Sequence, residues 1–265
     1  MNRATPTAPP PVYSEVPFTS RILSRDRLEG GLAVRLARTS EDIDAALQLR
    51  YEVFNLEFGE GLAAAFRTGR ECDQFDSDSE HLIIVDRKLQ RAVGTFRLRT
   101  YEIAKTAQGF YSSQQFDLSA LPPEILANAI EISRVCITRA HRHNEAQMML
   151  LNGLGMSLLQ REKRYLFGSF SLSTTDPMLA GRIFDQLDRE GHVHPRLRVA
   201  PKPGFKCMWY RGSDGPNGEN VISGWIRTCL QFGAKVFGPP AINRRFRTID
   251  LPFFLDGKQL DEIHR

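Results

Sequence analysis

A carboxylate and a guanidinium stand three residues apart in a strand-like segment, AIEISRVCI, which spans residues 129–137. Its apolar residues occupy alternate positions up to Ile132, as in a half-buried strand, but they resume at Val135 on the other parity. One inserted residue produces this change, which is typical of a β-bulge, and bulges are over-represented beside active sites. A bulge here would turn Glu131 and Arg134 onto one face, where they could act together on a substrate.

A salt bridge on a solvated sheet face is the commoner explanation of such a pair, so the chemical interpretation depends on further charged residues. Arg50 lies near the end of a predicted helix beside an apolar stripe, and packing alone does not require it. Asp73 and Asp76 stand three apart in an acidic loop, where they could cap a helix, form part of a metal cluster or bind a cationic group. Arg97 lies in mid-strand, where a lone charge needs a partner such as Asp76 or Glu131.

These residues are positioned by alternating strands and helices. Period-two patterns and apolar residues three or four apart distinguish the two kinds of element. The predicted strands cover residues 32–37, 81–87, 92–100, 129–137, 165–171 and 193–199. One predicted helix begins at Ser40, and three others cover residues 144–163, 176–190 and 221–232. Because the long helix joins two strands, the sequence predicts a βαβ unit in an α/β fold.

The chain divides into three predicted regions. Residues 1–30 contain several prolines and no sustained period, which predicts a disordered or loosely docked arm. Residues 31–200 hold the predicted core. A loop with several glycines and prolines then leads to residues 201–265, which we expect to form a C-terminal extension packed on the core.

Composition indicates an ordinary soluble protein. The chain has 265 residues, a hydrophobic content of 42% and a net charge of +4, which is too weak a bias to indicate nucleic acid. Its 4 cysteines lack the spacing of a zinc site or a disulfide framework. No apolar run is long enough to span a bilayer, and no secretory leader is evident. We therefore expect a cytoplasmic protein without a metal, although it could also lie on the inner membrane surface.

The charged motifs, taken in order, resemble the acyl-carrier-protein-dependent branch of the GNAT superfamily of N-acyltransferases. That branch contains autoinducer synthases, hemolysin-like N-acyl amino acid synthases and lyso-ornithine lipid synthases. The motif matches are an Arg four before a Phe, two Asp three apart, an Arg closing a Val-Gly-Thr strand, and a Glu three before an Arg. The matching residues are Arg50, Phe54, Asp73, Asp76, Arg97, Glu131 and Arg134. The tail GAKVFGPPAINRRFRTIDLPFFLD looks like that of the lyso-ornithine lipid synthases.

The resemblance implies a mixed, mostly antiparallel twisted sheet flanked by helices, with a bulged central strand and a C-terminal extension. It implies transfer of a fatty acyl chain, with or without a 3-hydroxyl group, from acyl carrier protein to the α-amino group of an amino acid such as ornithine, which would make an N-acyl amino acid or lyso-aminolipid, with no bound cofactor. Glu131 would be the base, with Arg97 and Arg134 beside it as catalytic residues. The substrate-binding residues would be Arg50, Phe54, Asp73, Asp76 and Ser133.

The acyl donor would be a phosphopantetheine thioester. The loop before the long helix, RAHRHNEAQ, lacks the glycine of coenzyme A users, which agrees with a carrier-protein donor. Basic residues at both ends of the helix are candidates for docking that acidic protein: Arg139, Arg142, Arg161, Lys163 and Arg164. A generic basic face is the alternative for each of them. Two other functions stay open, an acyl-homoserine-lactone synthase and a catalytically silent acyl-binding or membrane-surface protein.

Overall fold

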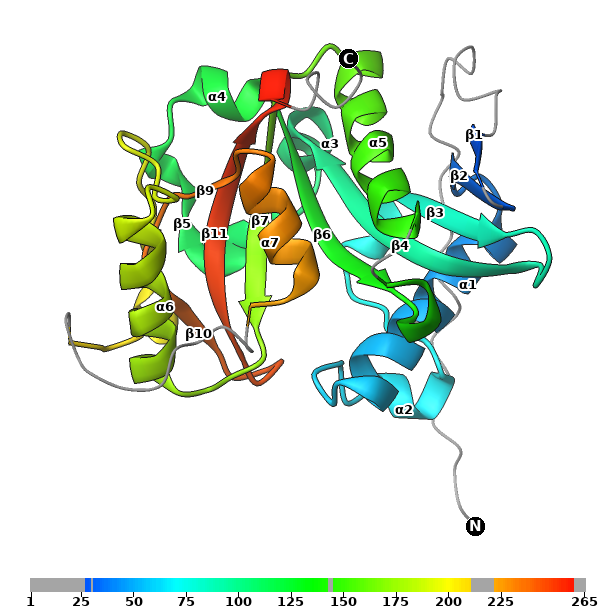
Figure 1. Ribbon diagram of the computed structural model, residues 1–265, viewed down its shortest axis with the longest axis horizontal. Coiled ribbons are helices and arrows are strands. Elements are labelled where there is room, and N and C mark those ends of the chain that lie inside the picture. The colour runs from blue at the N-terminus through cyan, green and yellow to red at the C-terminus, as the bar shows by residue number, and fades with distance from the viewer. Residues whose placement is uncertain (1–26, 30, 143–144, 211–221, 260–265) are drawn as a thin grey trace.

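The computed structural model describes residues 27–29, 31–142, 145–210 and 222–259, and a nine-stranded sheet organises them (Figure 1). The sheet order is β1-β2-β3-β4-β6-β7-β11-β10, and β9 also pairs with β11. Its strands are β1 (Arg27–Glu29), β2 (Leu32–Leu36), β3 (Glu80–Asp86), β4 (Arg91–Thr100), β6 (Ala129–Ile137), β7 (Tyr165–Leu172), β9 (Lys235–Val236), β10 (Ala241–Asn243) and β11 (Thr248–Asp256). A separate small sheet pairs β5 (Phe116–Asp117) with β8 (Ala200–Pro201).

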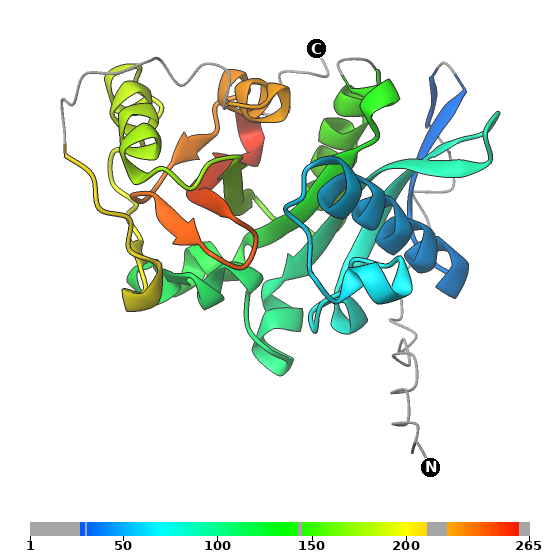
Figure 2. The ribbon, with the colours of Figure 1, turned by 90° about the horizontal axis from the view of Figure 1, so that it is seen from below.

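Helices cover both faces of the large sheet (Figure 2). The α-helices are α1 (Ser40–Arg50), α2 (Ala65–Thr68), α3 (Tyr101–Thr106), α4 (Pro123–Ala127), α5 (Glu145–Gln160), α6 (Pro177–Arg189) and α7 (Gly224–Gln231). Apolar residues of α5, α6 and α7 pack on one face in the main core, while α1 packs on the other against β4 and β6. The predicted fold class, a mostly antiparallel mixed sheet flanked by helices, is confirmed.

The strands β6 and β7 form the parallel pair, with α5 between them, so the predicted βαβ unit is confirmed. Their pairing runs from Ala129 and Tyr165 to Ile132 and Gly168 and then ends. Figure 1 shows the two strands diverging from there. A Cβ atom on Gly168 would lie 2.3 Å from the carbonyl oxygen of Ile132, so glycine permits the close approach at the point where the strands part.

The end of the chain contributes directly to the large sheet. Strand β11 pairs antiparallel with β7 from Ile249 to Asp256 and with β10 on its other side, so the predicted extension, residues 201–265, supplies an interior strand of the sheet as well as α7. The predicted strand at 193–199 is wrong, because this segment makes only an isolated bridge between Val193 and Val236. Most of the predicted arm, residues 1–30, lies outside the described residues, and its last part forms β1.

Candidate active site

The predicted bulge is present in β6. Thr95 pairs with Cys136 and Arg97 pairs with Ser133, so one residue of β4 faces two residues of β6. Arg134 is the inserted residue and has a φ of 54°, in the left-handed region that non-glycine residues rarely adopt. On either side of the bulge, Ile130, Ile132, Val135 and Ile137 face the main core, as predicted.

Six charged side chains form a buried ion cluster beneath this bulge. They are Arg50, Glu71, Asp73, Asp76, Arg97 and Arg134. Three guanidinium groups face three carboxylates, so the cluster carries no net charge when all six are ionised. Paired in this way, charges can be buried that would otherwise be too costly to remove from water.

Two carboxylates of the acidic loop hold Arg97. Its Nη1 donates to Asp73 Oδ1 at 2.5 Å and to Asp76 Oδ1 at 2.8 Å, while its Nε donates to Ser133 Oγ at 3.1 Å. Of the two partners predicted for Arg97, Asp76 or Glu131, the structure shows Asp76. Arg134 reaches the same loop, with its Nη2 3.1 Å from Asp73 Oδ2.

Arg50 anchors the other side of the cluster. Its Nη1 lies 2.7 Å from Asp76 Oδ1 and its Nε lies 2.7 Å from Glu71 Oε2. Glu71 was not predicted from the sequence, where it lies just before the acidic loop. A π-helix, Tyr51–Glu57, begins directly after Arg50 and carries Phe54 toward the bulge. Burial would raise the pKa of Asp76, but the guanidiniums of Arg50 and Arg97 hold it well below its usual range.

Glu131 lies apart from this cluster and is fully buried. Its Oε2 accepts a hydrogen bond from the Tyr111 N–H and its Oε1 accepts one from the Ser112 N–H, both at 2.6 Å. Burial raises the pKa of Glu131, although hydrogen bonds from Ser112 and Tyr111 oppose the shift. The Ser112 hydroxyl also hydrogen-bonds this carboxylate, and the Tyr111 ring lies 5.1 Å from the guanidinium carbon of Arg134.

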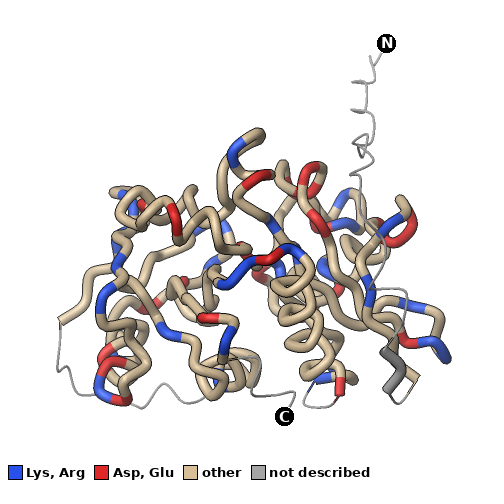
Figure 3. The backbone as a smooth tube through the Cα atoms, turned by 90° about the horizontal axis from the view of Figure 1, so that it is seen from above, with Lys and Arg blue, Asp and Glu red and all other residues tan. Residues whose placement is uncertain are grey.

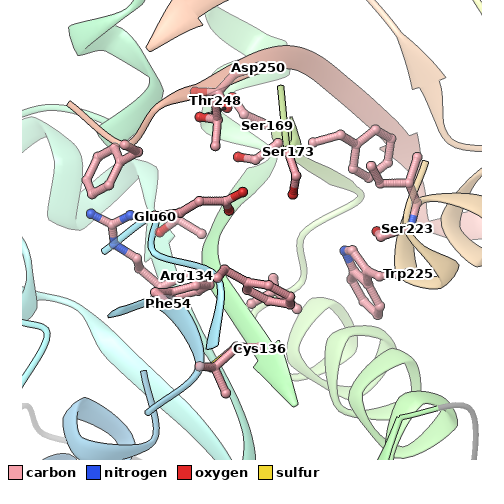
Figure 4. A pocket seen from close by; sticks show the side chains of 18 of the residues that line it. Phe54, Glu60, Arg134, Cys136, Ser169, Ser173, Ser223, Trp225, Thr248 and Asp250 are labelled. Carbon is pink, nitrogen blue, oxygen red and sulfur yellow. Dashed lines mark hydrogen bonds between the residues drawn. The ribbon is translucent and has the colours of Figure 1, made fainter. Parts of the chain in front are cut away.

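A cavity of about 480 Å³ opens where β6 and β7 part (Figure 4). Its apolar lining comes from the π-helix, the bulged strand, β7, β11 and α7. These residues are Val53, Phe54, Phe58, Ile132, Val135, Ile137, Phe170, Trp225, Ile226 and Phe253. Ser112, Ser133 and Arg134 bring polar groups of the bulge region to the same cavity, whereas Glu131 is not among its lining residues.

One end of this cavity is acidic and rich in hydroxyl groups. We define this acidic end by Glu60, Asp250, Ser169, Ser171 and Ser173, which all line the cavity. Glu60 and Asp250 were not predicted as site residues. The serines alternate in SFSLS, along the end of β7 and the residue after it, and this polar face of an otherwise apolar segment was the available sequence signal.

The structure does not bring the predicted docking residues together. Arg142 lines the cavity and pairs with Glu57, while Arg139 is exposed beside it. Arg161, Lys163 and Arg164 follow the far end of α5, and its 16 residues correspond to a length of about 24 Å. Each of these three also has an acidic partner: Glu80, Glu102 and Asp256, respectively. Figure 3 shows basic and acidic residues interspersed along the backbone.

Within the described part of the chain, no group of three or more His, Cys, Asp and Glu side chains is arranged to hold a metal ion. None of the helices described there is long and apolar enough to cross a bilayer.

Comparison with known proteins shows what the chain is similar to. Residues 49–152 match the acetyltransferase (GNAT) domain. The chain is 29% identical over 243 residues to an L-ornithine N(alpha)-acyltransferase of Rhodobacter capsulatus, covering 88% of this chain and 92% of that protein. It is 26% identical over 231 residues to the enzyme of the same name from Rhizobium meliloti, covering 83% and 78%.

Among solved structures, a CoA-dependent acyl-homoserine lactone synthase is similar at 16% identity with a TM-score of 0.47, covering 85% of this chain and 82% of that chain. The matched domain contains Arg50, the ion cluster, the bulged strand and the first half of α5. The chain is thus an acyltransferase with a GNAT domain, and along most of its length it is similar to L-ornithine N(alpha)-acyltransferases.

Proposed function

We propose that the protein transfers a fatty acyl chain, such as a 3-hydroxyacyl chain, from acyl carrier protein to the α-amino group of an amino acid such as ornithine. The observation that carries this proposal is the cavity at the divergence of β6 and β7, which joins an apolar channel to Arg134 and to an acidic end. The apolar lining suits an acyl chain, and the charged groups suit a zwitterionic acceptor. The similar L-ornithine N(alpha)-acyltransferases support ornithine as the acceptor.

The reaction joins the acceptor nitrogen to the thioester carbonyl carbon and breaks the carbon–sulfur bond. The amine loses a proton, the thiolate gains one, and the carbonyl oxygen carries negative charge in the tetrahedral intermediate. Past Ile132, the edge of β6 that faces β7 has no strand partner among the described strands, so its backbone N–H groups are available to that oxygen. Arg134 has further N–H donors beyond its bond to Asp73, and it would bind the acceptor carboxylate.

We assign the proton-accepting role to Glu131, acting through Ser112. The carboxylate does not line the cavity, but Ser112 does, and its hydroxyl is hydrogen-bonded to Glu131. A hydroxyl in this position can pass a proton from the amine to the carboxylate. The raised pKa of Glu131 favours this role, because a general base is most effective when its pKa approaches the working pH.

The carrier protein would dock at the cavity end of α5. Arg142 lines the cavity and Arg139 is exposed next to it, so an acidic carrier held there could insert its thioester directly. The basic residues beyond the other end of the helix lie about 24 Å away and would contribute less.

The test is acyl transfer by the purified protein supplied with 3-hydroxyacyl-acyl carrier protein and L-ornithine. Mass spectrometry should find N-acylornithine, and free carrier thiol should appear in equal amount. Acyl-CoA in place of the carrier thioester should support a much lower kcat/KM. A lactone formed only with S-adenosylmethionine would indicate an autoinducer synthase instead, and acyl binding without any product would indicate a silent protein.

A further inference from the structure

The acidic end of the cavity is built from two segments far apart in the sequence. Glu60 follows the π-helix and Asp250 lies on β11, opposite Ser171 of β7. Both carboxylates line the same cavity as Arg134. Figure 4 shows Ser173 and Asp250 at one end of the group of side chains, and Glu60 between Ser173 and Arg134. The cavity therefore offers two acidic groups and a guanidinium to whatever binds there.

The backbone holds Glu60 in place. Its N–H donates to the Phe54 carbonyl at 2.8 Å. The next residue, Gly61, packs against Asn55 so closely that a Cβ atom would lie 1.9 Å from Asn55 Oδ1. Asn55 is buried, and its Nδ2 donates to the Leu62 carbonyl at 2.8 Å. Glu60 is thus presented from a fixed turn, although its own side chain is only partly buried.

Within the part of the chain that the structure describes, the Glu60 carboxylate lacks a cationic partner. No Arg, Lys or His described there acts on this carboxylate, and its hydrogen bond comes from Ser173. Burial raises its pKa, and the nearby charge of Asp250 adds to the shift. This contrasts with the three carboxylates of the buried ion cluster, which all contact guanidinium groups. Glu60 is therefore an acidic group in the cavity that could bind a cationic group of a ligand.

Asp250 is more deeply enclosed. It is 4% exposed and accepts hydrogen bonds from Asn243 Nδ2 at 3.0 Å and Thr248 Oγ1 at 3.1 Å. These neutral donors hold the carboxylate in a fixed position without neutralising it. Burial raises its pKa despite these bonds. A bound cation near both acids would favour their ionised forms.

We propose that the acidic end binds the side-chain ammonium of a diamino acid through Glu60, with Asp250 adding negative charge, while Arg134 binds the α-carboxylate. This inference rests on the proposed function, and it assigns to named residues the selection of a diamino acid over an acceptor with a neutral side chain. The two charged ends fix the acceptor, so its α-amine lies between them and faces the thioester. When a buried polar group of a site binds a polar group of the substrate, the site strongly rejects analogues that lack that substrate group.

The experiment compares L-ornithine with L-norvaline, which has the same carbon chain without the side-chain amine. We expect the wild type to favour ornithine by about 100-fold or more in kcat/KM. Glu60→Gln should reduce this ratio by at least about tenfold, almost entirely through ornithine, with the norvaline kcat/KM within about threefold of wild type. Asp250→Asn should act in the same direction. Glu52→Gln, a change in the π-helix at a residue that does not line this cavity, is the matched control and should keep the wild-type ratio.

Binding without acyl transfer separates this inference from the proposed function. Ornithine should raise the Tm of the wild type more than norvaline does, and Glu60→Gln should remove the difference. If ornithine binds selectively but is never acylated, the proposed function fails and the inference stands. If Glu60→Gln lowers the rates of both amino acids equally, or leaves the selectivity and the Tm difference unchanged, the inference is overturned.

Discussion

Replacing Glu131 with Gln tests the assigned proton acceptor directly. The substitution keeps the size of the side chain but replaces one carboxylate oxygen with an NH2 group, which cannot accept the second of the two N–H bonds from Tyr111 and Ser112. Hydrogen bonds to a charged group contribute about 1.5–3 kcal/mol each, and a buried N–H left unpaired costs about 1–3 kcal/mol. Burial raises the pKa of Glu131, so removing its buried charge offsets part of this cost, and we expect the free energy of unfolding to fall by no more than about 1–2 kcal/mol.

The variant should lose most of its activity even under conditions in which it stays folded. Removal of a general base typically lowers the rate about 10²–10⁴-fold. At a temperature well below the Tm of the variant, we expect kcat to fall in that range while the variant stays folded by circular dichroism. Ser112→Ala should lower kcat in the same direction, because it removes the hydroxyl that connects the carboxylate to the cavity.

The pH profile distinguishes a base from a residue that only positions Tyr111. A base must be deprotonated, so the wild-type kcat/KM should rise with pH through the pKa of Glu131, which burial shifts above its ordinary value of 4.5. The Gln variant should lack this acid limb. A kcat within about tenfold of wild type, or an acid limb that persists in the variant, would refute the assignment.

Three further predictions follow from the charges. Asp76→Asn leaves two buried guanidiniums undercompensated and should lower the free energy of unfolding by about 3–5 kcal/mol, measured by urea denaturation. The Asp76 pKa is lowered in the folded state, so this contribution is fully present above its ordinary value of 3.8 and is lost as the pH falls through the folded-state pKa. Glu60→Gln should instead raise the free energy of unfolding at neutral and alkaline pH. Because the pKa of Glu60 is raised in the folded state, its ionised form destabilises the protein. The Tm of the variant should therefore exceed that of the wild type at pH 8, and the two Tm values should be equal at pH 4, where the acid is protonated. Arg142→Ala should lower kcat/KM for the acyl carrier protein and reduce its salt dependence, whereas Arg164→Ala should leave both nearly unchanged.

Local patterns predicted the centre of the site. The change of parity between Ile132 and Val135 lies within one strand, and a bulge is a property of that strand and its immediate partner. Helix α5 and strand β7 were also predicted, because each is marked by a pattern of apolar residues within its own segment. By contrast, residues 193–199 alternate like a strand, but they meet the neighbouring segment at only a few points, through a bridge at Val193 and single hydrogen bonds from His194 and Val199. Strand formation depends on a partner, which the local sequence does not reveal.

The acidic end could not be predicted in this way. Glu60 and Asp250 are separated by most of the chain, and they share a cavity because β11 returns to pair with β7. The docking residues show the converse case, in which residues near one another in the sequence lie far apart in the structure. Those between Arg139 and Arg164 are close in sequence, but α5 separates them into two groups. Proximity along a chain that contains a helix is a poor guide to a shared surface.

The buried ion cluster explains why Arg134 can occupy the bulge. A non-glycine residue in the left-handed region costs about 1–2 kcal/mol, and burying a guanidinium costs more unless it is paired. Asp73 and the rings of Tyr111 and Phe246, which lie 5.1 and 4.4 Å from its guanidinium carbon, offset these costs by fixing the group in one position. Asp73 is in turn fixed by Arg97, and Arg97 by Asp76 and Ser133. Replacing the cluster with apolar residues could keep the protein stable, but Arg134 would then lose the contacts that aim it at the acceptor.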